Sequence, residues 1–204
     1  MRGSKRMIKP NTDYKIDLLQ SNSVWEKKTK LRRVLWQCLV KPIYHLIPTK
    51  RLYHLRIWML RAMGATIGRD CLILPRVNIL MPWNLVLGDV VVLSHDVCIL
   101  NFAKVTVKSM SVISQGVHLC TGTHDYEHPH FPLTYEPIVI ESENWVASGA
   151  FIAPGVTLGR GCVVGAYSVV IKDMPAWMVC AGNPCKPIKR RDIKPTAEPT
   201  HDTV

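Results

Sequence analysis

The residues best suited to chemistry gather in one polar stretch of this 204-residue chain, between Thr121 and Pro137. His124 lies near its start, between Thr123 and Asp125. Because the unperturbed pKa of histidine is about 6.5, its ring can take a proton from an attacking hydroxyl and release it again near neutral pH. His124 is therefore a candidate general base. The alternative, a structural histidine, is disfavoured because the stretch interrupts an otherwise regular pattern.

The pattern around this stretch has a period of six residues. The last block has an aliphatic residue at every sixth position, namely Ile140, Val146, Ile152, Leu158, Val164 and Val170, with glycine or alanine recurring between them. This period fits neither a helix nor one long alternating strand. It fits short strands joined by tight turns of small or flexible residues, which is typical of a parallel β-helix. Ordinary antiparallel strands with tight turns are the alternative.

The period extends upstream in three blocks, 67–85, 87–99 and 107–119, each shifted in phase from the one before. Each shift predicts a small insertion at a corner of a coil. Between Leu119 and Ile140 the period fails, so the stretch 121–137 is predicted to leave the coil as a loop. Loops that interrupt a regular repeat often carry the function.

The chain is predicted to have three parts. Residues 1–63 form an N-terminal extension with a helical cap, 64–180 form the β-helix, and 181–204 form a basic C-terminal segment with a polar tail.

The cap is predicted to contain two short amphipathic helices, Leu31–Val40 and Arg51–Met63, divided by Pro42 and Pro48. A cap that covers the open end of the solenoid is the favoured interpretation, because such an edge needs protection. The alternative is a basic element, residues 31–63, that lies on an anionic membrane surface. Both roles are compatible.

The composition narrows the class of protein. The formal net charge is +11, and the basic residues concentrate near the two ends. They lack the interleaved aromatic residues of a base-stacking surface, so nucleic acid is not expected as a partner, nor is a non-catalytic scaffold favoured. The seven cysteines form no CxxC pair, which favours free thiols in a reducing cytoplasm. The inner face of the membrane is the alternative location.

Several spaced motifs carry a resemblance to a known family. They are Thr121–Tyr126, Trp145–Ala150, Pro154–Gly159, Val164–Asp173 and Ala181–Pro184. In this order they resemble the hexapeptide-repeat O-acetyltransferases, most of all those assigned to colanic acid biosynthesis and more distantly the galactoside and maltose O-acetyltransferases. The resemblance covers residues 60 to 190 or so, and the first sixty residues match only loosely.

The resemblance implies a left-handed parallel β-helix that assembles as a homotrimer, with the active site between neighbouring subunits. It also implies an acetyl-CoA donor, a saccharide hydroxyl as acceptor, and His124 as the base in a direct transfer without a covalent enzyme intermediate. No metal is expected. The acceptor itself, and acetyl as against a longer acyl group, stay open.

The remaining site residues are also carried over from the resemblance. Asn101 corresponds to an acceptor-binding position, although a turn-capping role is the alternative. Asp125 is placed with the acceptor-binding residues, and it could orient His124 or cap the loop. Coenzyme A is expected to contact a groove and a phosphate site made of Trp145, Ser148, Ala166, Ile171, Lys172, Lys186 and Lys189. Relatives often have Thr at position 171 and Arg at the last two positions, so contact there rests on backbone groups and on lysine as a point charge.

Two other activities stay open. A histidine base serves amines as well as hydroxyls, so N-acylation of an amino sugar or antibiotic is an alternative. A related β-helix family is a zinc-dependent carbonic anhydrase with three histidines at a subunit interface. Here His118 and His124 are six residues apart, which places them on successive faces of a coil and departs from that pattern.

Overall fold

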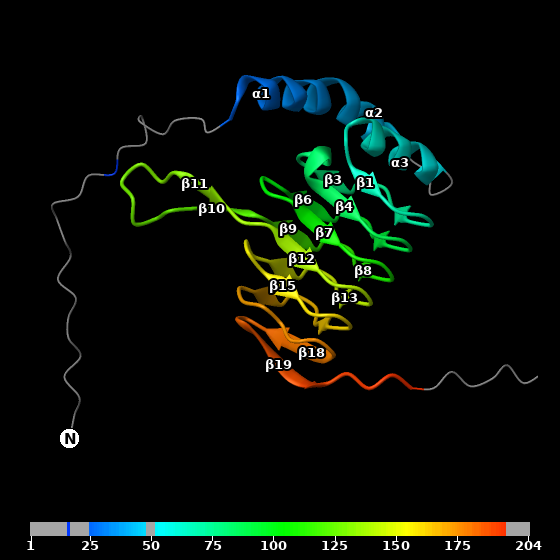
Figure 1. Ribbon diagram of the computed structural model, residues 1–204, viewed down its shortest axis with the longest axis vertical. Coiled ribbons are helices and arrows are strands. Elements are labelled where there is room, and N and C mark those ends of the chain that lie inside the picture. Colours follow the sequence, from blue (N-terminus) through cyan, green and yellow to red (C-terminus); the bar gives the residue numbers. More distant parts are fainter. Residues whose placement is uncertain (1–15, 17–24, 48–51, 195–204) are drawn as a thin grey trace, which may run out of the picture.

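The computed structural model describes residue 16 and residues 25–47 and 52–194. Its main body is a parallel β-solenoid whose coils stack along one axis, with helices over the N-terminal end (Figure 1). The predicted parallel repeat is therefore confirmed, and the antiparallel alternative is wrong for the coils, because each strand pairs in parallel with strands one coil away.

Three parallel sheets form the sides of the solenoid. The first sheet contains β1 (Thr66–Ile67), β4 (Leu85–Leu87), β7 (Val105–Val107), β12 (Ile138–Ile140) and β15 (Thr157–Leu158). The second contains β2 (Leu72–Ile73), β5 (Val92–Leu93), β8 (Val112–Ile113), β13 (Trp145–Val146), β16 (Val163–Val164) and β18 (Met178–Gly182). The third contains β3 (Asn78–Ile79), β6 (Cys98–Leu100), β9 (His118–Cys120), β14 (Phe151–Ile152) and β17 (Val169–Val170).

The register explains the phase shifts of the sequence period. Ile67 pairs with Leu87, twenty residues later, whereas Ile140 pairs with Leu158, eighteen residues later. The extra residues of the early coils lie at the corner between the third and first sheets, where the 3₁₀ helix η4 (Pro82–Asn84) sits. The predicted corner insertions are therefore present.

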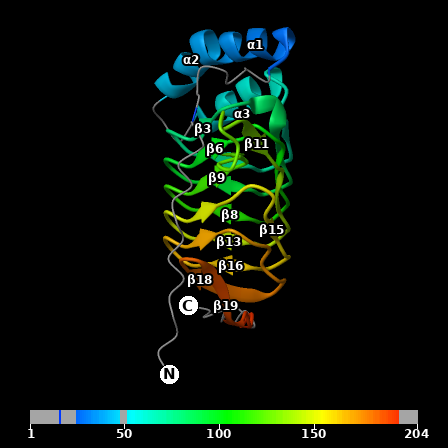
Figure 2. The ribbon, with the colours of Figure 1, turned by 90° about the vertical axis from the view of Figure 1, so that its left-hand side faces the viewer.

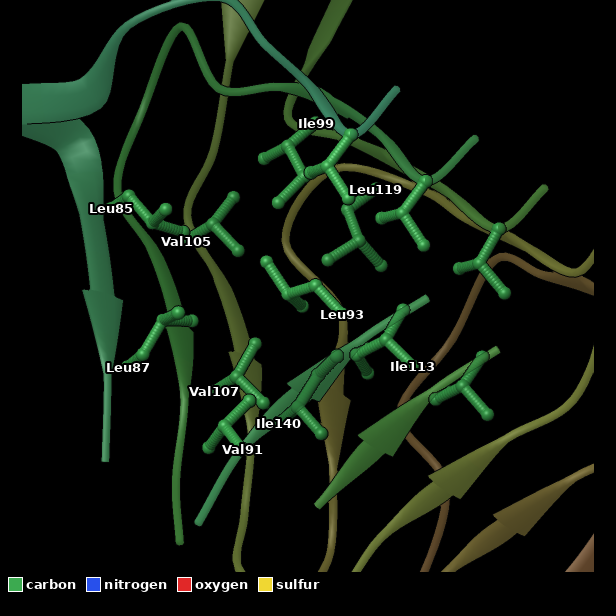
Figure 3. Packing of buried hydrophobic residues seen from close by; sticks show 14 of the residues in the cluster. Leu85, Leu87, Val91, Leu93, Ile99, Val105, Val107, Ile113, Leu119 and Ile140 are labelled. Carbon is green, nitrogen blue, oxygen red and sulfur yellow. The ribbon is translucent and has the colours of Figure 1, made fainter. Parts of the chain in front are cut away.

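The aliphatic residues of the repeat fill the interior of the solenoid. All six positions of the last block, from Ile140 to Val170, have no exposed surface. Figure 3 shows the same inward stacking in earlier coils, where residues such as Leu93 and Ile113 point into one continuous core. Burial of these side chains supplies the main driving force for the fold, since a buried Leu or Ile contributes about 1.5–3 kcal/mol.

The coil corners are tighter than the sequence pattern alone implies. A left-handed backbone recurs where the chain leaves each strand of the first sheet, and non-glycine residues hold it at Asp70, Val90, Met110 and Glu143. This conformation costs an L-residue roughly 1–2 kcal/mol. Hydrogen bonds between coils hold the corners, as from Val90 N to the Arg69 carbonyl at 2.8 Å. The expected small or flexible residues are therefore not required at every turn.

The helical cap differs from the sequence prediction in its first half. Helix α1 (Lys27–Val34), the π-helical segment η2 (Leu35–Val40) and α2 (Lys41–Leu46) follow one another without a break. Pro42 was expected to divide the helices, but it sits in the first turn of α2. The preceding π segment, in which the Lys41 amide bonds to the Trp36 carbonyl, widens the turn where proline would otherwise clash.

The cap packs on the first coil and donates hydrogen bonds to backbone carbonyls at its open edge. Trp36 is fully buried, and its indole nitrogen donates to the Ile79 carbonyl at 2.9 Å. In helix α3 (Tyr53–Ala62), the Arg56 guanidinium is also buried and donates to the carbonyls of Ile73 and Ile47. The carbonyls of Ile79 and Ile73 lie at the end of the solenoid, where no further coil can reach them, and the bond to Ile47 ties α3 to the end of α2. The described part of the N-terminal region is thus a cap, and Arg51 and Pro48 lie outside the described residues.

The other end of the solenoid is closed by a strand pair. Strand β19 (Cys185–Arg190) turns back antiparallel on β18, from Cys185 opposite Gly182 to Arg190 opposite Met178. The basic C-terminal segment is therefore partly a strand, and the predicted boundary between residues 180 and 181 falls inside β18. Figure 2 shows the cap and this closing pair at opposite ends of the stack. The final ten residues lie outside the described part.

Candidate active site

The predicted loop forms a β-hairpin that projects from the side of the third coil (Figure 1). Its strands are β10 (Gly122–His124) and β11 (Leu133–Tyr135). His124 pairs with Leu133, and Gly122 pairs with Tyr135. Residues directly opposite in an antiparallel pair, and those two apart in a strand, share one face. His124 and Tyr135 therefore lie on the same face of the hairpin.

One hydrogen bond determines which nitrogen of the neutral His124 ring carries the hydrogen. Its Nδ1 lies 2.6 Å from the carbonyl oxygen of Phe131. A carbonyl only accepts, so Nδ1 carries the hydrogen and Nε2 keeps its lone pair in the neutral ring. His124 is exposed, and its Nε2 has no hydrogen-bond partner among the residues that the structure describes. The ring is oriented as a proton acceptor.

Asp125 does not orient the histidine. Its Oδ1 accepts a hydrogen bond from the Glu127 amide at 3.1 Å, and its own amide donates to the Pro132 carbonyl at 3.1 Å. The carboxylate thus caps the turn at the tip of the hairpin. The orienting group is the backbone of Phe131, which has a positive φ of 42°. Sequence reasoning missed it, because any residue type supplies a carbonyl.

An aromatic stack joins the cap to the base of the hairpin. The Trp25 ring stacks on Phe102 at a centroid distance of 5.9 Å and on Tyr135 at 6.1 Å. Arg33 lies over the Trp25 ring at 5.3 Å. Phe102 packs so closely on Gly122 that a Cβ there would lie 2.4 Å from its ring. Nothing in the sequence pattern indicated this contact, because its members are far apart in the chain.

Asn101 lies inside the coil corner that precedes the hairpin by one turn. Its side chain has no exposed surface. Its Oδ1 accepts from the Met81 amide at 2.8 Å, and its Nδ2 donates to the Met81 carbonyl at 2.7 Å. A sugar hydroxyl would reach this amide only if the corner opened. The geometry of the chain therefore favours the turn-holding role for Asn101 over the predicted contact with the acceptor.

Three of the predicted coenzyme A positions follow one edge of the solenoid. Val146 pairs with Val164, so Ser148 and Ala166 hold the same corner position on consecutive coils. Lys186 pairs with Ala181 on β18, in the coil after that. Ala166 and Lys186 are exposed, and Ser148 is half-buried. The three positions therefore form a line along the corner between the second and third sheets.

A tyrosine that the sequence reasoning missed lies on the same edge. Tyr167 is 79% exposed, and a Cβ on Gly149 would lie 2.5 Å from its ring. Only a glycine at position 149 lets the ring lie so close to the corner of the previous coil. Tyr167 thus adds a flat surface beside Ser148 and Ala166.

The other predicted positions lie apart from this edge. Trp145 is 49% exposed on the outside of the second sheet, and its Nε1 donates to the Ser114 hydroxyl at 3.0 Å. Lys189 is on β19 opposite Val179. Ile171 and Lys172 follow β17 and are exposed at the corner between the third and first sheets.

Within one chain, His124 and the line of Ser148, Ala166 and Lys186 are on different corners. The hairpin with His124 leaves at the end of the third sheet, after β9, whereas Ser148 and Ala166 precede the third-sheet strands β14 and β17. The third sheet therefore separates the base from the groove positions. One chain alone does not assemble all the predicted site residues in one place.

The histidines of the coils do not converge on a zinc site. His95 lies at a corner of the second coil, where its Nδ1 is 3.2 Å from the Pro75 carbonyl. His118 lies on β9 opposite Cys98 and Phe151 of the neighbouring coils. Within residues 25–47 and 52–194, no three His, Cys, Asp or Glu side chains lie close enough together to hold a metal ion.

The structure is a solenoid of hexapeptide coils with an exposed histidine on a projecting hairpin, and comparisons with known proteins place this solenoid among the hexapeptide transferases. Residues 137–172 match the family described as "Bacterial transferase hexapeptide (six repeats)". The chain is 44% identical over 157 residues to the Escherichia coli K12 protein named "Putative colanic acid biosynthesis acetyltransferase WcaF". The matched region covers 77% of this chain and 86% of that protein.

Solved structures share the fold. A galactoside acetyltransferase in complex with coenzyme A has a TM-score of 0.75 and 26% identity, over 83% of this chain and 86% of that one. A maltose O-acetyltransferase from Clostridium difficile 630 has a TM-score of 0.74 and 24% identity, over 82% and 90%. The chain belongs to the hexapeptide-repeat acetyltransferase family.

Proposed function

We propose that the chain transfers an acetyl group from acetyl-CoA to a hydroxyl of a saccharide, with His124 as general base. The observation that carries the proposal is the bond between His124 Nδ1 and the Phe131 carbonyl, which leaves Nε2 to accept a proton. The relative named for colanic acid biosynthesis and the galactoside acetyltransferase bound to coenzyme A support the saccharide acceptor and the donor.

In the proposed reaction, His124 Nε2 removes the proton of the acceptor hydroxyl as its oxygen attacks the thioester carbon. The C–O bond forms, and the tetrahedral intermediate then collapses as the C–S bond breaks. His124, now protonated, returns the proton to the departing thiolate. The histidine ends neutral, so one ring serves both as base and as acid, and no acyl-enzyme is needed.

The groove positions fit a long, narrow donor. Ser148 and Ala166 have small side chains on consecutive coils, which leaves room for a chain-like ligand along the edge. Lys186 extends the line with a positive charge, which suits a phosphate. Tyr167 offers an exposed ring beside it. Asp125, Trp145, Ile171, Lys172 and Lys189 remain predicted contacts.

We infer that the working unit is a homotrimer in which His124 of one subunit faces the groove of its neighbour. The support is the separation of His124 from Ser148 and Ala166 by the third sheet within one chain. A closed ring with one repeated interface would bring the two corners together three times.

The base assignment is tested by His124→Ala. We expect turnover of a saccharide acceptor to fall by about a hundredfold or more, while calorimetric binding of acetyl-CoA stays unchanged. The matched control is His54→Ala, which removes an exposed histidine of α3 and should keep full turnover. Near-normal turnover of His124→Ala contradicts the assignment. An amino sugar acetylated faster than its hydroxyl analogue would favour N-acylation, and about one zinc per chain with carbonic anhydrase activity would favour the lyase.

The trimer is tested by complementation. Ala166→Trp should block the groove without disturbing the fold, because Ala166 is exposed. Each of His124→Ala and Ala166→Trp is expected to be inactive alone. Mixed trimers regain activity if a site takes its base from one subunit and its groove from the next. Mixed trimers without activity would place both in the same subunit.

A further inference from the structure

The cap carries large apolar side chains on the surface that faces away from the coils. Six of them are exposed by 58% or more, namely Leu31 (71%), Val34 (58%), Leu39 (60%), Ile43 (58%), Leu46 (77%) and Trp58 (65%). The opposite side of the same segments is buried on the solenoid through residues such as Trp36 and Leu60. Within the part of the chain that the structure describes, the solenoid covers one side of these segments, and the large apolar side chains on the other side stay exposed.

Part of this apolar surface is hollowed into a groove between the two helical segments. One wall comes from Val40 and Ile43, and the other from α3. The α3 side contributes Leu55, Trp58, Met59, Ala62 and Met63. Every lining residue is apolar. Contiguous apolar surface of this kind on a folded protein marks an interaction site more often than single exposed side chains do.

The positive charge of the cap indicates an anionic partner. Residues 25–47 and 52–63 contain eight Lys or Arg and one acidic residue, Glu26. Lys27, Lys28 and Lys30 are exposed on α1. A surface that combines apolar side chains, an exposed tryptophan and lysines complements an anionic bilayer, which attracts basic residues and takes apolar side chains into its interface.

The position of the cap allows such contact. The helices lie at one end of the coil stack, opposite β18 and β19, so a flat surface can meet them without meeting the coils (Figure 2). No helix in the described part of the chain is long and apolar enough to cross a bilayer.

We propose that the outer face of the cap, built from α1, η2, α2 and α3, docks on the surface of an anionic lipid bilayer. The apolar side chains enter the interface between headgroups and acyl chains, and the lysines of α1 pair with lipid phosphates. The contact is independent of the acetyl transfer proposed above, because none of these residues belongs to the candidate active site.

The test is flotation of the full chain with vesicles of phosphatidylcholine containing about a third phosphatidylglycerol, and with vesicles of phosphatidylcholine alone. We expect binding to the anionic vesicles that weakens as salt is raised. Changing Lys27, Lys28 and Lys30 to Gln should lower the partition coefficient by about a hundredfold, since each basic residue at the surface contributes roughly fivefold. Leu46→Ser with Trp58→Ser should lower it by at least about tenfold, from lost apolar burial.

The matched control is Ile188→Ser on β19, which removes an apolar side chain of 65% exposure at the far end of the stack. It should bind vesicles as the unchanged chain does. All variants change exposed side chains, and equal melting temperatures would verify the fold. Absence of vesicle binding, or equal binding by the double Ser variant, overturns the proposal. So does light scattering without vesicles in which that variant lowers the oligomeric mass, because the face would then be buried between copies of the chain.

Discussion

The stacking of Trp25 with both Phe102 and Tyr135 predicts that a residue outside the hairpin controls how firmly the hairpin is held. The perturbation is Trp25→Ala, which removes both ring contacts. Each aromatic pair contributes about 0.5–1.5 kcal/mol beyond its buried area, so the loss is about 1–3 kcal/mol. If the hairpin exchanges between a docked and an open position, the equilibrium shifts toward the open one by about 5- to 150-fold.

Two assays follow from this estimate. Amide hydrogen exchange in β10 and β11 should accelerate by the same about 5- to 150-fold, while exchange in the buried coils stays unchanged. Turnover should fall, and acetyl-CoA binding should not, because the rings that Trp25 stacks on, Phe102 and Tyr135, are not among the predicted coenzyme A positions. Trp25→Phe keeps a ring in the stack and should restore most of both properties.

The control is Trp58→Ala, which removes a tryptophan of the same cap that is 65% exposed. It should leave exchange in the hairpin unaltered. The reasoning is refuted if Trp25→Ala keeps full protection of β10 and β11. It is also refuted if exchange accelerates equally throughout the coils, since Trp25 would then stabilise the whole fold and not the hairpin.

Three further predictions concern stability and thiol chemistry. Trp36→Ala should lower the free energy of unfolding by about 3–5 kcal/mol in denaturant titrations, because it leaves a cavity and an unpaired Ile79 carbonyl; an unchanged midpoint would show that the cap adds nothing. The hydrogen bond from Arg160 holds the pKa of the Glu143 carboxyl below its ordinary 4.5, so the pair stabilises the fold above that pH and the contribution is lost as the pH falls through the lower folded value. Melting temperatures should show a small acid loss that Glu143→Gln reduces, and an equal loss in that variant would contradict the pairing. Exposed Cys38 should react first with a thiol reagent and Cys162 only on unfolding, because burial raises the pKa of the Cys162 thiol; mass spectrometry of early label on Cys162 would refute this.

The repeat was predictable because it is a local and redundant signal. The inward positions at Ile140, Val146 and Ile152 recur with one spacing, and each has the same physical reason to be aliphatic. The cap was harder to predict. Pro42 normally ends a helix, and only the widened turn of η2, which the sequence does not mark, lets the helical segment continue.

The candidate site was also predictable only in part. His124 was identifiable because the period fails around it, and the structure places it on a hairpin with an oriented ring. The orientation itself was hidden, because it comes from a backbone carbonyl at Phe131 that any residue could supply. For Asn101 the sequence left both roles open, since an amide suits a sugar as well as it suits the Met81 backbone, and its burial now favours the turn-holding role.

The sequence by itself determined the period and the strand positions, and it singled out His124 as the candidate base, because aliphatic residues recur at regular spacing and that spacing is interrupted around His124. Only the tertiary structure decided which residues far apart in the chain contact one another. In the folded chain Trp25 stacks on Tyr135, and Trp36 donates a hydrogen bond to the Ile79 carbonyl. His124 and Ser148 lie on different corners of the solenoid. Contacts between residues far apart in the chain depend on how coils of eighteen or twenty residues stack, and no local pattern records that stacking.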